Sequence, residues 1–130
     1  MTLIGSARFA ILILSLLPAY ASEPFPFGSE SMLDTGPLYG SKRIPMVEIE
    51  EDGTAAIDLW CATTKAQVAV GDSSMTIVAE APVAAQCTPE RATGDQDLLT
   101  ALAQVTNWRR NGDIIELSGA TTLRFHVMTN

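Results

Sequence analysis

The chain offers few side chains that could carry out catalysis. Its one histidine, His126, alternates with apolar neighbours in a strand-like stretch, so we expect the imidazole to face outward or to lie at a sheet edge. A Ser-His-Asp hydrolase site also needs a nucleophile and an acid beside the ring, and the sequence contains no G-x-S-x-G phrase. Glycine-rich phosphate loops, dinucleotide-binding glycines and zinc-ligand spacings are absent from the sequence as well. We therefore predict no catalytic residues, no cofactor and no bound metal, and we expect the protein not to be an enzyme; an enzyme with an unrecognised site is the weakest alternative.

Two cysteines, Cys61 and Cys87, are the candidates for a covalent feature. In an exported protein two such residues are interpreted as one disulfide, because the extracytoplasmic space is oxidising. Closing this loop would contribute on the order of 3 kcal/mol to the free energy of unfolding. The alternative is a redox-active or metal-binding pair. It is disfavoured because the cysteines do not form a C-x-x-C arrangement and no second ligand cluster accompanies them.

Acidic side chains alternate along two strand-like stretches and raise the question of a cation site. The acids concerned are Glu48, Glu50, Glu51, Asp52 and Asp58. No calcium-loop spacing is present, and alternating acids on a strand are typical of a solvated sheet face, so we predict the solvated face. The chain has fifteen Asp and Glu against eight Lys and Arg, a formal charge of −7. This balance argues against binding to nucleic acid or to an anionic membrane surface, because both need clustered basic residues.

The first 21 residues have the pattern of a secretory signal peptide. One positive charge, at Arg8, precedes an apolar core over residues 9–17, Pro18 ends that core, and Ala19-Tyr20-Ala21 is a small-x-small cleavage site. The core is short for a membrane-spanning helix, which needs roughly 20 apolar residues. We therefore predict cleavage after Ala21, a periplasmic or secreted mature protein, and no stable membrane anchor after cleavage. An uncleaved anchor is the alternative.

One stretch of the chain is typical of an amphipathic helix. Apolar residues at 3- and 4-residue steps predict a helix over residues 95–107 that presents one face to a sheet. Thr93, Gly94 and Asp95 precede the apolar run and offer a cap and a negative charge to its first turn. The apolar face comprises Leu98, Leu99, Leu102, Val105 and, directly after the helix, Trp108.

A short antiparallel meander follows the predicted helix. Asn111-Gly112 has the chemistry of a tight turn, and Ile115 and Leu117 then alternate with polar residues. Ser118-Gly119 makes a second turn, which leads into a last alternating strand over residues 123–128.

Upstream of the helix, the chain divides into a lead-in and a domain body. Residues 22–45 are rich in Pro, Gly and Ser and predict an extended lead-in, with one short strand over residues 31–34. Residues 46–130 form the body of one small domain, in which two hairpins precede the helix. We predict an α+β fold: an antiparallel, partly barrel-like sheet of about seven short strands, with one α-helix packed on it and covering one opening. The expected core is Ile49, Ile57, Leu59, Val68, Ile77, Leu102, Val105, Leu117, Leu123 and Phe125.

The order of several features resembles a known family. A cysteine at Cys87, a leucine-rich helix leading to Trp108, a glycine-aspartate turn and a strand ending at Phe125 follow one another as in the C-terminal half of the META domain. This family contains HslJ-like small bacterial envelope proteins. The hairpin that ends at Cys61 resembles the family's earlier cysteine phrase, although Ala62 replaces the asparagine of that phrase. The resemblance implies the fold and the compartment, and it supplies no catalytic residues to transfer.

Two functions of different classes follow. The resemblance implies a noncatalytic secreted or periplasmic protein, linked to envelope stress as in the heat-shock relative, that acts through an unidentified binding surface. The alternative is a small disulfide-locked periplasmic inhibitor of a protease or other envelope enzyme, because Phe25 and Phe27 form a hydrophobic arm (residues 22–28) ahead of a rigid body. Packing of both rings on the protein's own core is the simpler interpretation of this arm. In either case we expect a monomer whose partner is an unknown envelope protein or ligand.

Overall fold

The computed structural model describes Gly5, Ala10, residues 23–36, Leu38, residues 42–83 and residues 86–129. The predicted signal peptide, residues 1–21, lies outside the described residues apart from Gly5 and Ala10. No helix in the described ranges is long and apolar enough to cross a membrane.

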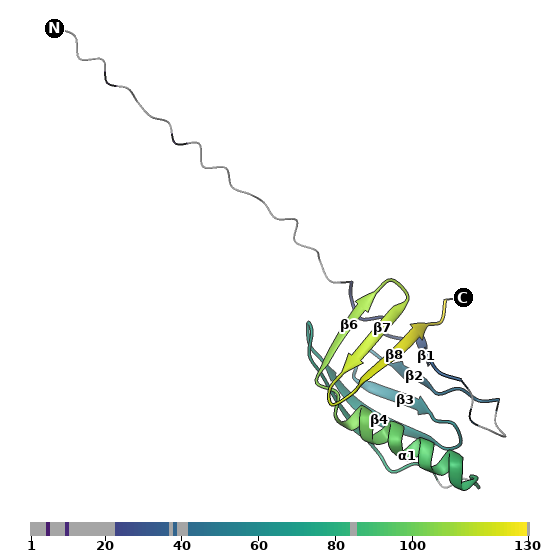
Figure 1. The fold of residues 1–130 in the computed structure, drawn as a ribbon. Coiled ribbons are helices and arrows are strands. Elements are labelled where there is room, and N and C mark those ends of the chain that lie inside the picture. The colour runs from purple at the N-terminus through teal and green to yellow at the C-terminus, as the bar shows by residue number, and fades with distance from the viewer. Residues whose placement is uncertain are drawn as a thin grey trace.

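The described chain folds into one antiparallel sheet of eight strands and one α-helix (Figure 1). The strand order is β5-β4-β3-β2-β1-β8-β7-β6, so each hairpin neighbour in sequence is also a neighbour in the sheet. The predicted α+β class is confirmed, and the predicted count of about seven strands is one short. The strands are β1 (Glu30–Leu33), β2 (Met46–Ile49), β3 (Thr54–Asp58), β4 (Thr63–Val70), β5 (Met75–Ala79), β6 (Asn107–Asn111), β7 (Ile114–Ser118) and β8 (Thr122–Val127).

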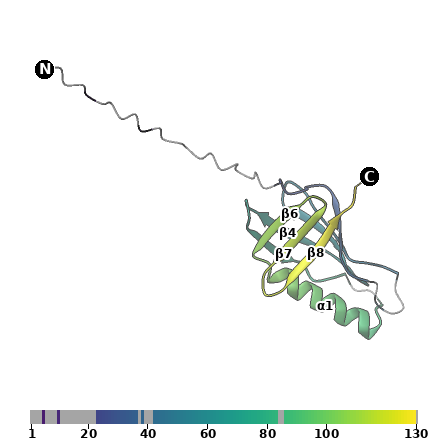
Figure 2. The same ribbon diagram turned by 45° about the horizontal axis from the view of Figure 1, so that its top comes forward.

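The two edges of the sheet meet and nearly close a barrel. Ser74, directly before β5, forms a bridge with Asn107 at the start of β6. On either side of this bridge, the Met75 amide donates to the Thr106 carbonyl and the Trp108 amide to the Ser73 carbonyl, both at 2.9 Å. Figure 2 shows the resulting curvature, with β4 behind β7 and β8.

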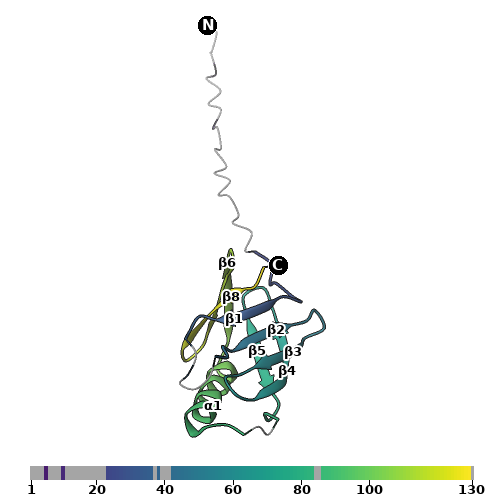
Figure 3. The ribbon, with the colours of Figure 1, turned by 90° about the vertical axis from the view of Figure 1, so that its right-hand side faces the viewer.

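Helix α1 (Pro89–Ala103) lies at one end of this curved sheet (Figures 1 and 3). It begins where Thr88 caps the first turn and Pro89 occupies the first helical position, a place where the missing N–H of proline costs nothing. The prediction of a helix over residues 95–107 was therefore wrong at both ends. Its start was misplaced because the first two turns of α1 are polar and lack the apolar periodicity on which the prediction relied.

Trp108 accounts for the missing strand. Its spacing from Val105 continues the helical pattern, but the chain leaves the helix at Gln104 and Trp108 lies inside β6. The Asn111-Gly112 turn that follows is confirmed, because Gly112 takes a positive φ of 60° between β6 and β7.

The core lies inside the barrel and between the sheet and the helix. Nine of the ten residues expected there are buried; Leu123 is partly buried and packs against the edge of the core. Pairs such as Val47 and Ile57, opposite each other on β2 and β3, show that the strand alternation predicted the inward face correctly. The buried residues outside the expected list include Leu33, Val47, Ala55, Ala62, Ala66, Met75, Leu98, Trp108, Ile115 and Val127.

Candidate functional site

The disulfide is confirmed and anchors the start of the helix to the β3–β4 hairpin. Cys61 and Cys87 are bonded, with their Cα atoms 5.8 Å apart and a sequence separation of 26. Asp95, from the second turn of α1, brings a carboxylate close to both sulfurs, so that the ligand-type atoms of all three residues lie within 4.8 Å of one another. This is the one such group in the described part of the chain. Because both sulfurs are committed to the disulfide, neither is a thiolate that could bind a metal.

Asp95 is the polar residue that the sequence interpretation placed wrongly. It was expected at the helix start, but its carboxylate is buried, with 4% of the residue exposed. Its Oδ2 accepts from the Ala62 amide at 2.8 Å, and its Oδ1 accepts from the Cys61 amide at 3.2 Å. The signal that could have found it is its spacing, because Asp95 precedes Leu98 and Leu102 on the same helical face.

The acids once considered as a cation site fall into separate environments. Glu48 and Glu50 face outward from β2, and a hydrogen bond with Glu50, together with desolvation and the charges of Glu50 and Glu30, raises the pKa of Glu48. Glu51 and Asp52 lie in the next turn, where hydrogen bonds from the hydroxyl and amide of Thr54 lower the pKa of Asp52. The fifth acid, Asp58, is paired with Arg43 at 3.4 Å. These contacts describe a solvated sheet face.

His126 lies on the outer face of β8, as predicted from the alternation. Its Nε2 is 3.4 Å from an oxygen of Asp34, and the side chain of each is about half exposed. The same Asp34 carboxylate pairs with Arg124 at 3.6 Å. The described contact of the imidazole is thus a contact with a carboxylate on the protein surface.

The arginines of the meander line a hollow on the outer face of β6, β7 and β8. Arg109, Arg110 and Arg124 surround a space of about 400 Å³ together with Asn111, Ile114 and Glu116. Each arginine already has an acidic partner: the three pairs are Arg109 with Glu116, Arg110 with Glu23, and Arg124 with Asp34. These acids therefore largely neutralise the positive charge of the three arginines.

The N-terminal arm, residues 23–28, is docked on the end of the barrel away from α1 (Figures 1 and 3). The Gly112 amide donates to the Glu23 carboxylate at 2.9 Å, Arg110 donates to the Pro24 carbonyl at 2.9 Å, and the Gly28 amide donates to the Ile49 carbonyl at 2.9 Å. This arrangement confirms that the arm packs on the protein's own core.

The two phenylalanines of the arm join Trp108 in one aromatic cluster. The Phe25 ring centroid is 5.2 Å from that of Trp108 in an edge-on arrangement and 5.0 Å from that of Phe27. The Trp108 indole N–H donates to the Gly71 carbonyl at 2.8 Å and so ties the cluster to the β4–β5 turn. We name the surface depression beside it, of about 300 Å³, the aromatic hollow; it is lined by Glu23, Pro24, Phe25, Phe27, Val70, Gly71, Asp72 and Trp108.

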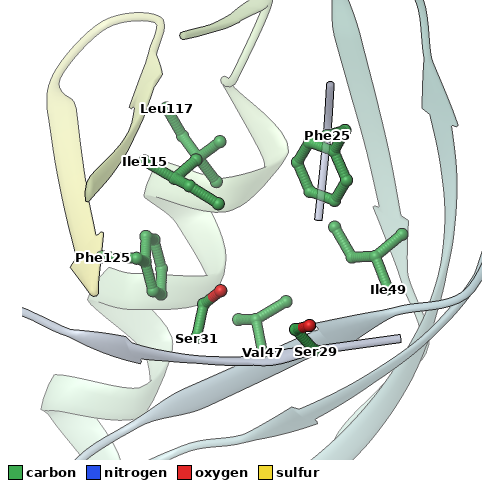
Figure 4. A pocket seen from close by; sticks show the side chains of 8 residues that line it. All are labelled: Phe25, Ser29, Ser31, Val47, Ile49, Ile115, Leu117 and Phe125. Atoms are coloured by element: carbon green, nitrogen blue, oxygen red, sulfur yellow. The ribbon is translucent and has the colours of Figure 1, made fainter. Parts of the chain in front are cut away.

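The barrel interior beneath Phe25 is almost filled (Figure 4). A cavity of about 20 Å³ remains, which is room for about one water molecule. Figure 4 shows Phe25 and Ile49 on one side of this space and Ile115, Leu117 and Phe125 on the other. Ser29 and Ser31 are the polar side chains of its lining.

Comparison with known proteins identifies one family. The sequence model described as META domain matches residues 28–130, which include all eight strands, the helix and both cysteines. The match begins within the stretch that was predicted as a lead-in, in keeping with the position of β1 in the middle of the sheet. No curated protein and no solved structure matches the chain.

Proposed function

Because the chain belongs to the META-domain family, we propose that it is a noncatalytic protein of the cell envelope that acts through a binding surface. The observation that carries this proposal is the filled barrel. A cavity of about 20 Å³ accepts no organic ligand, whereas small-molecule pockets span some 300–1,000 Å³. Recognition therefore takes place on the outer surface, and we expect a monomer that does not bind nucleic acid.

The disulfide and the N-terminal sequence support an extracytoplasmic location. A disulfide forms and persists in oxidising compartments, and residues 1–21 have the pattern of a cleaved signal peptide. Periplasmic or secreted localisation is part of the proposal, as is a link to envelope stress, which rests on the resemblance to the heat-shock relative.

The experiment that tests this function is a general lysine-reactive cross-link of the tagged protein in intact cells, combined with fractionation of the envelope. We expect release with the periplasmic or secreted fraction and capture of one stoichiometric envelope partner. A cytoplasmic location, or turnover of an envelope substrate by the purified protein, would contradict the proposal. A deletion strain exposed to heat and to envelope-active agents tests the stress link separately.

The inhibitor alternative loses the feature that suggested it. It depended on a hydrophobic arm free to enter another protein's cleft, but Phe25 packs on Trp108 and on Phe27, and both phenylalanines pack against the core. No other observation of the described residues favours an inhibitor.

A further inference from the structure

We propose that the aromatic hollow binds a positively charged side chain, arginine or lysine, on an exposed segment of a partner protein. This proposal rests on the proposed function and deepens it by naming the surface and the chemistry of the partner. The hollow is open to solvent and lies where the arm, the β4–β5 turn and β6 meet.

Three aromatic rings line the hollow. Phe25, Phe27 and Trp108 all line the hollow, and the aromatic contacts between them hold the rings in a fixed arrangement. The electron-rich face of an aromatic ring attracts a cation within about 6 Å, with a gain of roughly 0.5–2 kcal/mol per contact. Because the rings are held in place before the ligand arrives, little conformational entropy is lost on binding.

The rim of the hollow carries negative charge. Two carboxylates, Glu23 and Asp72, line the same hollow. Glu23 is engaged by Arg110 and by the Gly112 amide. Asp72 is exposed in the β4–β5 turn, and no cation of the described residues pairs with it. A ligand with an aliphatic stem and a cationic head would place the stem against Val70 and the rings and the head beside Asp72.

The negative charge of the hollow favours a cationic side chain over an anionic partner or a lipid surface. An anionic partner would be repelled by the carboxylates of Glu23 and Asp72, the two charged side chains that line the hollow. A lipid surface suits exposed aromatic residues, but the carboxylates of Glu23 and Asp72 would oppose their insertion into it. The formal charge of −7 on the whole chain further favours the approach of a basic segment.

The test is an NMR titration of the isotope-labelled, disulfide-intact mature protein with two capped peptides. One is Gly-Gly-Arg-Gly-Gly, and the other replaces arginine by citrulline, which has nearly the same shape without the charge. We expect the arginine peptide to shift the Trp108 indole signal and the amide signals of Gly71 and Asp72, and the citrulline peptide to bind more weakly. Equal shifts from both peptides, or no shifts at the hollow, would overturn the proposal.

Variants separate the hollow from general electrostatics. The substitutions Asp72→Asn and Phe27→Leu should each weaken binding of the arginine peptide roughly threefold. Each removes one contact to the cation and leaves a side chain of similar size. Asp97→Asn, which removes the same charge from the exposed face of α1, is the matched control and should leave the affinity unchanged. Equal losses in Asp72→Asn and Asp97→Asn would also overturn the proposal. The proposal would also be overturned if the wild-type protein bound zwitterionic vesicles and Phe27→Leu abolished that binding.

A photo-cross-linking amino acid at position 73, an exposed neighbour of Asp72, distinguishes failure of this site from failure of the proposed function. If the general cross-link captures a partner and position 73 does not, the partner uses another surface, so the proposed function stands and the hollow is excluded. If position 73 captures the same partner, and the substitution Phe27→Leu in the same protein prevents this, the partner occupies the hollow.

Discussion

The buried carboxylate of Asp95 accepts a hydrogen bond of 2.8 Å from the backbone amide of Ala62 and thereby joins the helix to the β3–β4 hairpin. The Cys61 amide donates to the same carboxylate, and the disulfide from Cys61 to Cys87 closes over it. One helical side chain therefore satisfies two donors of a tight turn, at the point where helix and sheet are also linked covalently.

Asp95→Asn should lower the free energy of unfolding by about 1–3 kcal/mol, because an amide offers one acceptor oxygen and turns an N–H toward the second donor. The measurement is chemical denaturation of the disulfide-intact protein. The control is Asp97→Asn on the exposed face of the same helix, for which we expect a change within about 0.5 kcal/mol. Equal stability of Asp95→Asn and the wild type would show that solvent replaces these hydrogen bonds without cost.

Reduction of the disulfide should destabilise the protein. A loop of this length predicts a loss of about 3.5 kcal/mol in the free energy of unfolding, from the entropy that the unfolded chain regains. The Cys61→Ala/Cys87→Ala double variant should show a loss of the same order without any reductant. Thiol labelling of unfolded, unreduced protein from the envelope checks the oxidation state, and two reactive thiols would contradict the disulfide.

The pair of Glu48 and Glu50 should make stability depend on pH. The hydrogen bond with Glu50 and the nearby negative charges raise the pKa of Glu48 above its ordinary value of 4.5. A carboxyl whose pKa is higher in the folded state binds its proton more tightly there. Its stabilising contribution is therefore complete below the ordinary pKa and is lost as the pH rises through the folded-state pKa.

Glu50→Gln tests this sign. The substitution removes the neighbouring charge, so the pKa of Glu48 should fall toward its ordinary value and the variant should gain stability relative to the wild type as the pH rises above that value. Carboxyl NMR titration measures the pKa, and denaturation on either side of it measures the stability. Glu51→Gln, in the adjacent turn, is the control. A Glu48 pKa that is unchanged by Glu50→Gln would assign the shift to another cause.

The strands were predictable where one face meets the core and the other meets water. In β8, Phe125 is buried while its neighbours Arg124 and His126 are exposed, as the period-two pattern predicts. β6 was missed because its sequence, Asn-Trp-Arg-Arg-Asn, has one fully buried side chain and continues the spacing of the helix. A single buried residue cannot show the two-residue alternation of a strand. The strand is therefore identified by its pairing with β7.

The proposed binding surface could not be predicted from the sequence, for a different reason. Phe25 and Phe27 were predicted as a hydrophobic arm and Trp108 as part of the apolar face that follows the helix, but about eighty positions separate the arm from Trp108. No local sequence pattern predicts that the N-terminal arm packs beside β6. The barrel closure and the contacts of Arg110 with the arm bring these residues together, and both are tertiary features.

Phe25→Ala should lower the free energy of unfolding by about 1–3 kcal/mol. This is less than for a fully buried phenylalanine because the ring is half-buried, and it includes the loss of the edge-on contact with Trp108. The substitution also opens the barrel end above the interior cavity, so solvent should reach the Trp108 indole and its fluorescence should move to longer wavelength. Val83→Ala removes an apolar side chain that is 68% exposed and is the control, with no change expected. A Phe25→Ala protein with wild-type stability and fluorescence would mean that the arm does not close the barrel in solution.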